Sequence, residues 1–265
     1  MSDFSQMPSA DGDVRLLSEP RSLAASAGFA WLGMAWRLFK RRTGVWLGMA
    51  VIVMIINGLL SLHPLLSMLG SFLSLLFVGG FMLAADALEQ GDELRVSYVF
   101  AGFKYKFKPL LQCTFLYTIL MLLVLMLAMS VFMAMSGGEL DATLLNGLDE
   151  QGADAEILLL IASLLVFILP VVMMTWFAPA LICLHDVGVW QAMKMSLRGA
   201  LANVGAFICH FLAWLGVIVA FVLAIVGVGQ LWLPLAAVVV VLGSLLFSVV
   251  LMLSYYSSYK SVWTE

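Results

Sequence analysis

Two pairs of side chains in the sequence carry the chemistry of a metal site. Cys183 and His185 stand two residues apart, and Cys209 and His210 are adjacent. Two thiolates with two imidazoles form a common zinc ligand set. On a helix, however, residues two apart point about 200° apart and adjacent residues about 100° apart, so neither pair converges on one ion. We therefore interpret these cysteines, and Cys113, as apolar packing residues, and expect no metal and no bound cofactor.

Residues for acid–base or nucleophilic catalysis are equally sparse. A hydrolase needs a histidine that converges with carboxylates, or an activated nucleophile. The three histidines of the sequence are His63, which stands apart, and the two named above. The sequence contains neither a glycine-rich phosphate loop with its lysine nor an HExxH motif. The pattern favours a protein that is not an enzyme.

Composition indicates where such a chain resides. Of its 265 residues, 63% are hydrophobic and 11% are charged. Soluble domains carry about 25% charged and about 45–50% apolar residues. A soluble chain of this length cannot bury so much apolar surface, so lipid must serve as its solvent. The formal net charge of −3 gives no field that would attract nucleic acid.

Six apolar stretches are long enough to cross a bilayer, which takes about 20 helical residues. The alternating pattern of a membrane β-barrel is absent, and lipid requires every backbone group to be satisfied internally. We therefore predict an all-α polytopic membrane protein. Its transmembrane helices are predicted at about 45–62, 65–85, 109–135, 157–184, 204–228 and 231–255.

The basic residues are sorted between alternate connections. All 13 lysines and arginines precede the first predicted helix, follow the sixth, or lie between helices two and three or four and five. The connection at 136–156 holds acidic residues and no basic one. The positive-inside rule then predicts a multi-pass protein of the bacterial inner membrane, with both termini cytoplasmic and 136–156 periplasmic. The acidic start, 1–21, is predicted to be a disordered cytoplasmic tail before a single membrane domain at 22–265.

A basic, aromatic segment precedes each odd-numbered helix. In the first, Phe29, Leu32, Trp36 and Phe39 recur at helical spacing. In the last, Trp190, Met193, Leu197 and Leu201 form an apolar stripe, and Asp186 is placed to cap the helix. The middle segment, 98–108, alternates aromatic residues with lysines. These patterns predict three helical hairpins, each preceded by an amphipathic segment at the membrane interface.

Cationic side chains of these segments are the candidate functional residues. Lys and Arg beside an anionic leaflet gain about 1 kcal/mol each, and aromatic residues anchor at the interface. The segments are therefore either ordinary topology signals or a cytoplasmic collar that holds anionic phospholipids or a partner membrane protein. The candidate contacts are Arg37, Lys40, Arg41, Arg42, Lys104, Lys106, Lys108, Lys194 and Arg198.

Few polar residues fall within the predicted helices. Asn57 is predicted to hydrogen-bond a neighbouring helix, Asp86 to reach cytoplasmic water, and Gln112 to lie near the start of the third helix. A carboxylate near the midplane, as expected of an ion-coupled transporter, is missing. Pro170 and Pro179 are predicted to interrupt the fourth helix, either as a packing kink or as a broken helix that lines a cavity.

Several short motifs resemble known proteins. The run Ala35-Trp-Arg-Leu-Phe-Lys-Arg-Arg-Thr-Gly-Val-Trp-Leu-Gly48, with Gly79-Gly80 and Phe100-Ala-Gly-Phe103, resembles a family of uncharacterised bacterial inner-membrane proteins. The run Ala192-Met-Lys-Met-Ser-Leu-Arg198 is similar to a pattern in the membrane domain of some glycerophosphodiester phosphodiesterases. This resemblance implies a six-helix inner-membrane architecture. It implies no activity, because these membrane regions have no assigned catalytic residues.

Two functions remain open from the sequence. The first is a non-enzymatic inner-membrane protein of unknown activity that binds or organises lipids or other membrane proteins. Its partners would be the bilayer, anionic phospholipids, and another membrane protein or a second copy, with no nucleic acid. The alternative is a small-molecule transporter or permease, which a cavity lined by Asn57, Thr175 or Gln112 would favour.

Overall fold

The computed structural model describes residues 15–135 and 153–265, with side chains described at 15–134 and 162–265. Within these residues every regular element is a helix, and six helices are long and apolar enough to cross a membrane. The predicted all-α polytopic fold with six transmembrane helices is therefore confirmed. Residues 1–14 of the predicted tail and 136–152 of the predicted acidic loop lie outside the described residues.

The six spans follow one another as hairpins. The first hairpin consists of α2 (Thr43–Leu60) and α3 (Pro64–Gln90), and the third of α10 (Val204–Leu231) and α11 (Leu233–Trp263). The second consists of α5 (Phe107–Met135) and α7 (Ala153–Trp176), which is continued by α8 (Ala178–His185). A shorter segment precedes each hairpin, as the sequence predicts: α1 (Ala27–Arg41), the 3-10 helix η1 (Val96–Phe100) with α4 (Ala101–Tyr105), and α9 (Val189–Leu201).

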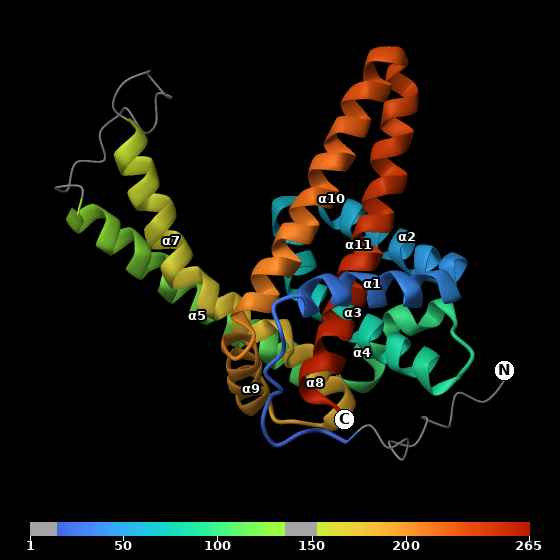
Figure 1. Ribbon diagram of the computed structural model, residues 1–265, viewed down its shortest axis with the longest axis horizontal. Coiled ribbons are helices and arrows are strands. Elements are labelled where there is room, and N and C mark those ends of the chain that lie inside the picture. The colour runs from blue at the N-terminus through green and yellow to red at the C-terminus, as the bar shows by residue number, and fades with distance from the viewer. Residues whose placement is uncertain (1–14, 136–152) are drawn as a thin grey trace.

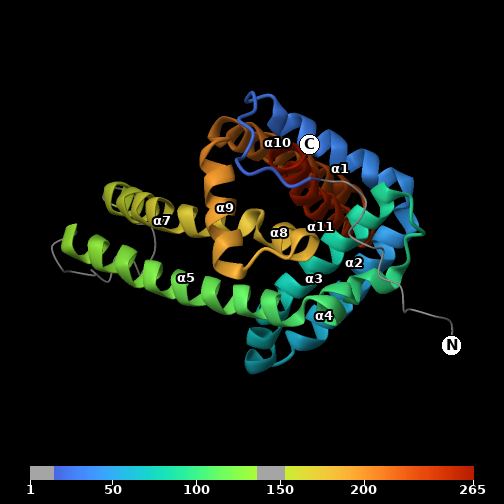
Figure 2. The ribbon, with the colours of Figure 1, turned by 90° about the horizontal axis from the view of Figure 1, so that it is seen from below.

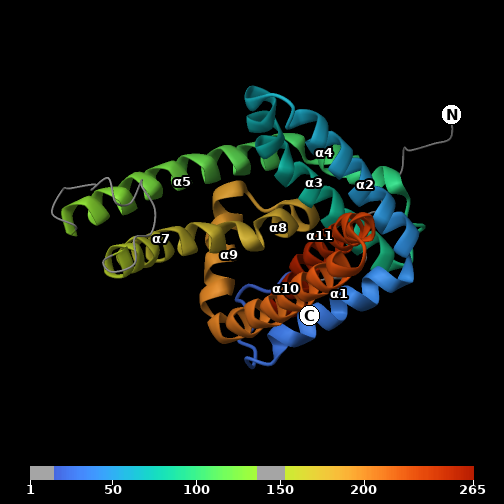
Figure 3. The same cartoon turned by 90° about the horizontal axis from the view of Figure 1, so that it is seen from above.

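The hairpins diverge from a common base (Figure 1). The α10–α11 hairpin stands upright in that view, whereas α5 and α7 lean away to the left. Seen from above, the α2–α3 hairpin points in a third direction (Figure 3). Seen from below, α8, α9 and the C-terminus cover the base, and α1 runs along one edge (Figure 2). Helix packing is therefore concentrated where the hairpins meet.

The base is built from fully buried aromatic side chains and close backbone contacts. Trp31, Trp46, Tyr256, Tyr259 and Trp263 are all buried there. A methyl group on Gly102 would lie 2.0 Å from the carbonyl oxygen of Leu76, and one on Gly80 would lie 2.6 Å from that of Val99. Since lipid tails are as apolar as these side chains, such close packing, rather than the hydrophobic effect, holds membrane helices together.

Two spans continue further at the base than their hydropathy predicts. The second span, predicted to end at 85, reaches Gln90, and the sixth, predicted to end at 255, reaches Trp263. Polar residues begin where the apolar runs stop, and those of α3 pair with those of α11. Because their polar groups satisfy one another, both helices extend beyond the apolar window.

The fourth span breaks once, at Phe177 between α7 and α8. Pro179 lies in the first turn of α8, where proline is well tolerated, whereas Pro170 lies inside α7 without ending it. Of the two predicted alternatives, a break is therefore found near Pro179 and not at Pro170. At the break, the Ser196 hydroxyl of α9 takes the place of a helical hydrogen bond: it accepts from the Phe177 N–H at 2.8 Å and donates to the Met173 carbonyl at 2.7 Å.

Candidate functional site

The packed face of α1 is its small-residue face. Gly28, Trp31 and Ala35 are buried, and α1 contacts α10 and α11. Of the predicted apolar stripe, Phe39 is buried, but Phe29 is 53% and Trp36 is 42% exposed. Small residues allow helix backbones to approach, so Gly28 and Ala35 mark the face of α1 that packs on the protein, and Trp31, Leu38 and Phe39 are buried beside them. The predicted interfacial segment is thus also part of the base.

The same division holds for α9. Its buried face carries Ala192, Met193, Ser196, Gly199 and Ala200. Trp190, from the predicted apolar stripe, is 51% exposed. The prediction that Asp186 caps this helix is wrong: Gly188 is the N-cap, and Asp186 ends α8 in a left-handed conformation. The Asp186 carboxylate forms an ion pair with Lys106 instead of accepting from the N-terminus of α9.

Outward-facing cations and aromatic rings occur together on both helices. On α1, Trp36 stacks on Phe39 with ring centroids 5.3 Å apart, beside exposed Arg37 and Lys40. On α9, the Lys194 Nζ lies 5.5 Å from the centroid of the Trp190 ring. We call this set the basic–aromatic surface; it comprises Phe29, Trp36, Arg37, Lys40, Trp190, Lys194 and Arg198. Within the described residues none of its cations forms a salt bridge.

The remaining candidate cations differ in their availability. Lys106, at 11% side-chain exposure, is committed to Asp186, and Arg41 donates to the Leu88 carbonyl at 3.0 Å. Lys104 lies over the Tyr105 ring at 4.9 Å. Arg42 and Lys108 are exposed. The structure therefore separates cations that can meet a ligand from those that hold helices together.

Charged residues also meet between α3 and α11, in a cluster that the sequence analysis missed as a unit. The Tyr256 hydroxyl lies 3.0 Å from a carboxylate oxygen of Asp86 and 3.0 Å from one of Glu89. The Gln90 amide donates to Asp86 at 2.6 Å, and Lys260 pairs with Glu89 at 2.9 Å. Asp86 is half-buried, and besides the predicted contact with water, which the structure does not test, its oxygens are held by α11 and by its own helix. The available sequence signal was that carboxylates at the C-terminal end of the second predicted span and a tyrosine and a lysine after the sixth all lie on the same side of the membrane.

Replacing Tyr256 by phenylalanine should lower the free energy of unfolding by about 2 kcal/mol. The change removes the hydroxyl between two carboxylates while it keeps the buried ring. Unfolding in a mild detergent, followed by intrinsic fluorescence, measures the loss. Tyr255→Phe is the matched control, because the Tyr255 hydroxyl bonds no other described residue. Equal losses in the two variants would contradict the bridging role of Tyr256.

Both histidines at the base already have hydrogen-bond partners within the protein. The Nε2 of His210 accepts from the Trp214 indole N–H at 3.1 Å, so its Nδ1 donates to the Gly28 carbonyl at 3.1 Å. His185 hydrogen-bonds the Tyr259 hydroxyl. In the part of the chain that the structure describes, no three His, Cys, Asp or Glu side chains gather as a metal site.

Asn203 is a further structural residue whose side chain the sequence analysis did not single out. It is buried, its Oδ1 accepts from the Leu23 N–H at 2.8 Å, and its Nδ2 donates to the Arg21 carbonyl at 2.8 Å. Asn203 therefore ties the chain before α1 to the junction of α9 and α10. The available sequence signal was its position between two predicted helices, where an asparagine side chain often bonds backbone groups.

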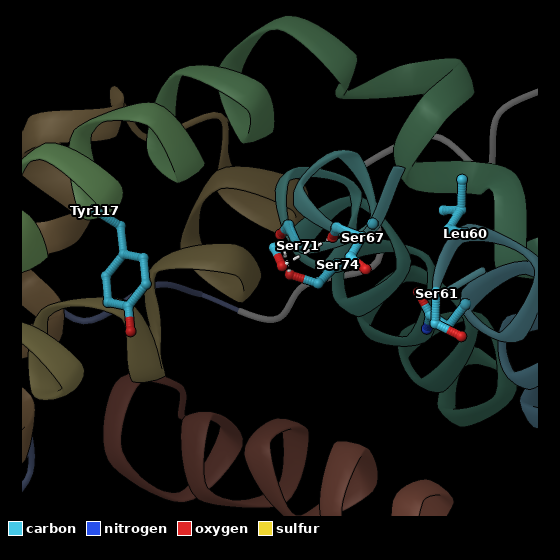
Figure 4. Close-up of a pocket in the computed structure, with 8 residues that line it drawn as sticks. Leu60, Ser61, Ser67, Ser71, Ser74 and Tyr117 are labelled. Carbon is cyan, nitrogen blue, oxygen red and sulfur yellow. Dashed lines mark hydrogen bonds between the residues drawn. The ribbon is translucent and has the colours of Figure 1, made fainter. Parts of the chain in front are cut away.

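Asn57 and Gln112 do not make the helix contacts expected of buried polar residues. Both are exposed on the protein surface, and the Asn57 amide bonds no other described residue. The predicted interhelical hydrogen bond of Asn57 is therefore wrong. Instead Asn57 lines a groove with Ser61, Ser67, Ser71, Ser74 and Tyr117, with a volume of about 450 Å³ (Figure 4).

Outside the spans, one ion pair lies in the connection after α3. Arg95 donates to Glu93 from Nε at 3.2 Å and from Nη2 at 2.7 Å. The Arg95 guanidinium lowers the pKa of the Glu93 carboxyl below its usual value. Arg95 is thus an exposed cation that already has a partner.

Comparison with known proteins supports the membrane assignment. A protein named as a probable inner membrane protein from Burkholderia thailandensis is 28% identical over 252 residues, which cover 90% of this chain and 91% of that protein. No protein-family model matches the chain, and no solved structure matches it. The name of the relative and the six apolar helices together identify a multi-pass inner-membrane protein. The resemblance to the membrane domain of glycerophosphodiester phosphodiesterases finds no support in these comparisons.

Proposed function

We propose that this inner-membrane protein is not an enzyme, and that it binds anionic phospholipids through the basic–aromatic surface and so organises the surrounding lipid or neighbouring membrane proteins. One observation carries the proposal: Arg37, Lys40, Lys194 and Arg198 are exposed and have no carboxylate partner among the described residues. Cations placed to stabilise the fold would be paired, as Lys106 and Lys260 are.

The neighbouring aromatic rings support lipid as the ligand. Trp36 and Trp190 are each about half exposed beside these cations. Indole rings prefer the headgroup level of a bilayer, where an apolar body meets a polar environment. Each nearby Lys or Arg gains about 1 kcal/mol from an anionic leaflet. Rings and cations side by side on each of these two helices therefore match the two chemical layers of a phospholipid interface.

The proposal includes an orientation. The basic–aromatic surface would face the cytoplasmic leaflet, where anionic lipid and the positive-inside rule both place Lys and Arg. Both termini would then be cytoplasmic. Labelling from the periplasm of a cysteine introduced at Lys108, an exposed position of the base, would contradict this orientation.

Neutralising the α9 cations should weaken anionic-lipid retention several-fold. The double variant Lys194→Gln/Arg198→Gln removes two charges that form no salt bridge among the described residues. Each is expected to contribute about 1 kcal/mol before screening by salt. The protein is reconstituted in nanodiscs of equal phosphatidylglycerol and phosphatidylcholine, then gently extracted. Native mass spectrometry counts the phospholipids that remain bound.

Arg95→Gln serves as the control, because it removes an exposed cation that is already paired with Glu93. We expect the control to retain phosphatidylglycerol as the unmodified protein does. Retention that is unchanged in the α9 variant, or equally reduced in both, would refute the proposed surface. A test that neutralised Lys104, Lys106 and Lys108 together would be ambiguous, since Lys106 also holds Asp186.

Transport of a small molecule is the second candidate. The groove that contains Asn57 favours it, since polar lining in a membrane-spanning region is costly and marks function. Thr175 donates its hydroxyl to the Val172 carbonyl of its own helix, and neither it nor Gln112 lines that groove. The groove therefore supports binding at one end of the membrane more strongly than passage through it.

A further inference from the structure

The groove on the α2–α3 hairpin shares no residue with the basic–aromatic surface and is chemically unlike it. Ser67, Ser71 and Ser74 face it from α3, Asn57 and Ser61 from the end of α2, and Tyr117 from α5 (Figure 4). None of its lining residues is charged. It begins near the turn at Ser61 and follows α3 for about 10 Å, the rise of the helix between Ser67 and Ser74.

Three of the serine hydroxyls that line the groove already donate to backbone carbonyls. Ser71 donates to the Ser67 carbonyl at 3.2 Å, Ser74 to the Ser71 carbonyl at 2.7 Å, and Ser61 to the Gly58 carbonyl at 2.8 Å. These hydroxyls therefore present oxygen lone pairs to the groove and act as acceptors. The Asn57 amide and the Tyr117 hydroxyl bond no other described residue, so they add donors. The lining thus offers acceptors and donors together, without charge.

An uncharged lining that offers both donors and acceptors favours some classes of ligand over others. A carboxylate or phosphate carries acceptors only and would meet serine oxygens with no cation to offset its charge. A cation would find no carboxylate. A hydroxyl group donates to one partner and accepts from another, which matches serine oxygens beside Asn57 and Tyr117. The apolar side chains next to the serines, Met68 and Leu69, are exposed and would face lipid tails.

We propose that this groove binds an uncharged, hydroxyl-bearing group, such as a sugar or glycerol moiety. The ligand hydroxyls would donate to Ser71 and Ser74 and accept from the Asn57 amide. In an apolar surrounding, these bonds compensate the cost of an otherwise unpartnered amide. A membrane lipid with a neutral headgroup and a free polyol share this chemistry and are distinguished below.

The protein is purified in a zwitterionic detergent without sugar groups and placed in phosphatidylcholine nanodiscs that contain monoglucosyl diacylglycerol. Native mass spectrometry counts glucolipid that stays bound, and a parallel sample contains free glucose as competitor. Asn57→Leu and Ser71→Ala/Ser74→Ala should each reduce bound glucolipid about fivefold or more, as expected for the loss of one or two hydrogen bonds. Alanine is a good helix former, so the serine variants keep their fold.

Ser130→Ala is the matched control: its hydroxyl also bonds back to its own helix, to Met126 at 2.8 Å, but lies outside the groove. It should bind glucolipid normally. If free glucose displaces the bound glucolipid, the groove still binds a hydroxyl-bearing group, and its ligand is then a soluble polyol. Binding that is absent in the unmodified protein, or equal in the groove variants and the control, would overturn the proposal. Phosphatidylglycerol retention should not change in the groove variants, which separates this site from the basic–aromatic surface.

Discussion

Replacing Gly28 by alanine is expected to detach α1 from the base and to lower the free energy of unfolding by about 3 kcal/mol or more. The added methyl group would lie 2.0 Å from the Ala206 carbonyl oxygen and 2.5 Å from the His210 nitrogen. Both atoms belong to the α10 backbone, so no rotation of a side chain can relieve the clash. One of the helices must move.

That movement also breaks a buried hydrogen bond. His210 donates from Nδ1 to the Gly28 carbonyl, and its Nε2 accepts from Trp214. If α1 withdraws, the imidazole loses its acceptor in an apolar setting, which adds to the cost of the clash. Trp31, which packs edge-on against His210 at 5.5 Å, would also lose contact.

Gly33→Ala is the control within the same helix. The nearest atom to its new methyl group is Nη1 of Arg37 at 3.9 Å, an ordinary contact. Alanine favours a helix over glycine by about 0.5–1 kcal/mol, so this variant should be slightly more stable. Thermal unfolding in detergent compares the two. A similar loss of stability in both variants would show that α1 and α10 do not touch at Gly28.

The spans were predictable because two independent signals agree on them. Apolar length gives the helices, and the sorting of basic residues separates their connections. The ends of α3 and α11 were not predictable from hydropathy. Considered singly, Asp86 and Lys260 are charged residues that are expected to end a membrane span and to lie in water. Their helices continue because Tyr256 and Glu89 complete a cluster that exists only after folding.

The orientation of α1 and α9 was harder to predict for a physical reason. In a soluble protein the large apolar face points inward, but in lipid an apolar side chain gains little by leaving the membrane. Close approach of backbones decides instead, and small residues permit it. Gly28 and Ala35 on α1, and Gly199 and Ala200 on α9, therefore mark the packed faces, on which Trp31 and Met193 are also buried, while Trp36 and Trp190 stay outside.

The motifs quoted for the family resemblance are packing motifs. Gly80 contacts the backbone of Val99, Gly102 contacts that of Leu76, and the rings of Phe77 and Phe103 lie 4.9 Å apart. Two runs that are separate in sequence thus form one joint between α3 and the η1–α4 segment. Such motifs specify a fold, which explains why they pointed to the architecture and to no activity.

Replacing Ser196 by alanine should lower the free energy of unfolding by about 2–4 kcal/mol, because it leaves one buried and one partly buried backbone group without partners. The hydroxyl accepts from the Phe177 N–H and donates to the Met173 carbonyl at the junction of α7 and α8. Without it, that junction either keeps two unsatisfied groups or closes as a regular turn, which would shift α8 relative to α9.

The buried Ser257 provides the control. Its hydroxyl bonds only to the Leu253 carbonyl of its own helix, so Ser257→Ala removes a hydroxyl of equal burial that joins no separate segments. We expect a loss below about 1 kcal/mol for this variant. Denaturant titration gives both values, and hydrogen exchange at Phe177 should accelerate in the Ser196 variant alone. Unaltered exchange there, with equal stability of the two variants, would mean that α9 does not supply the missing helical bond.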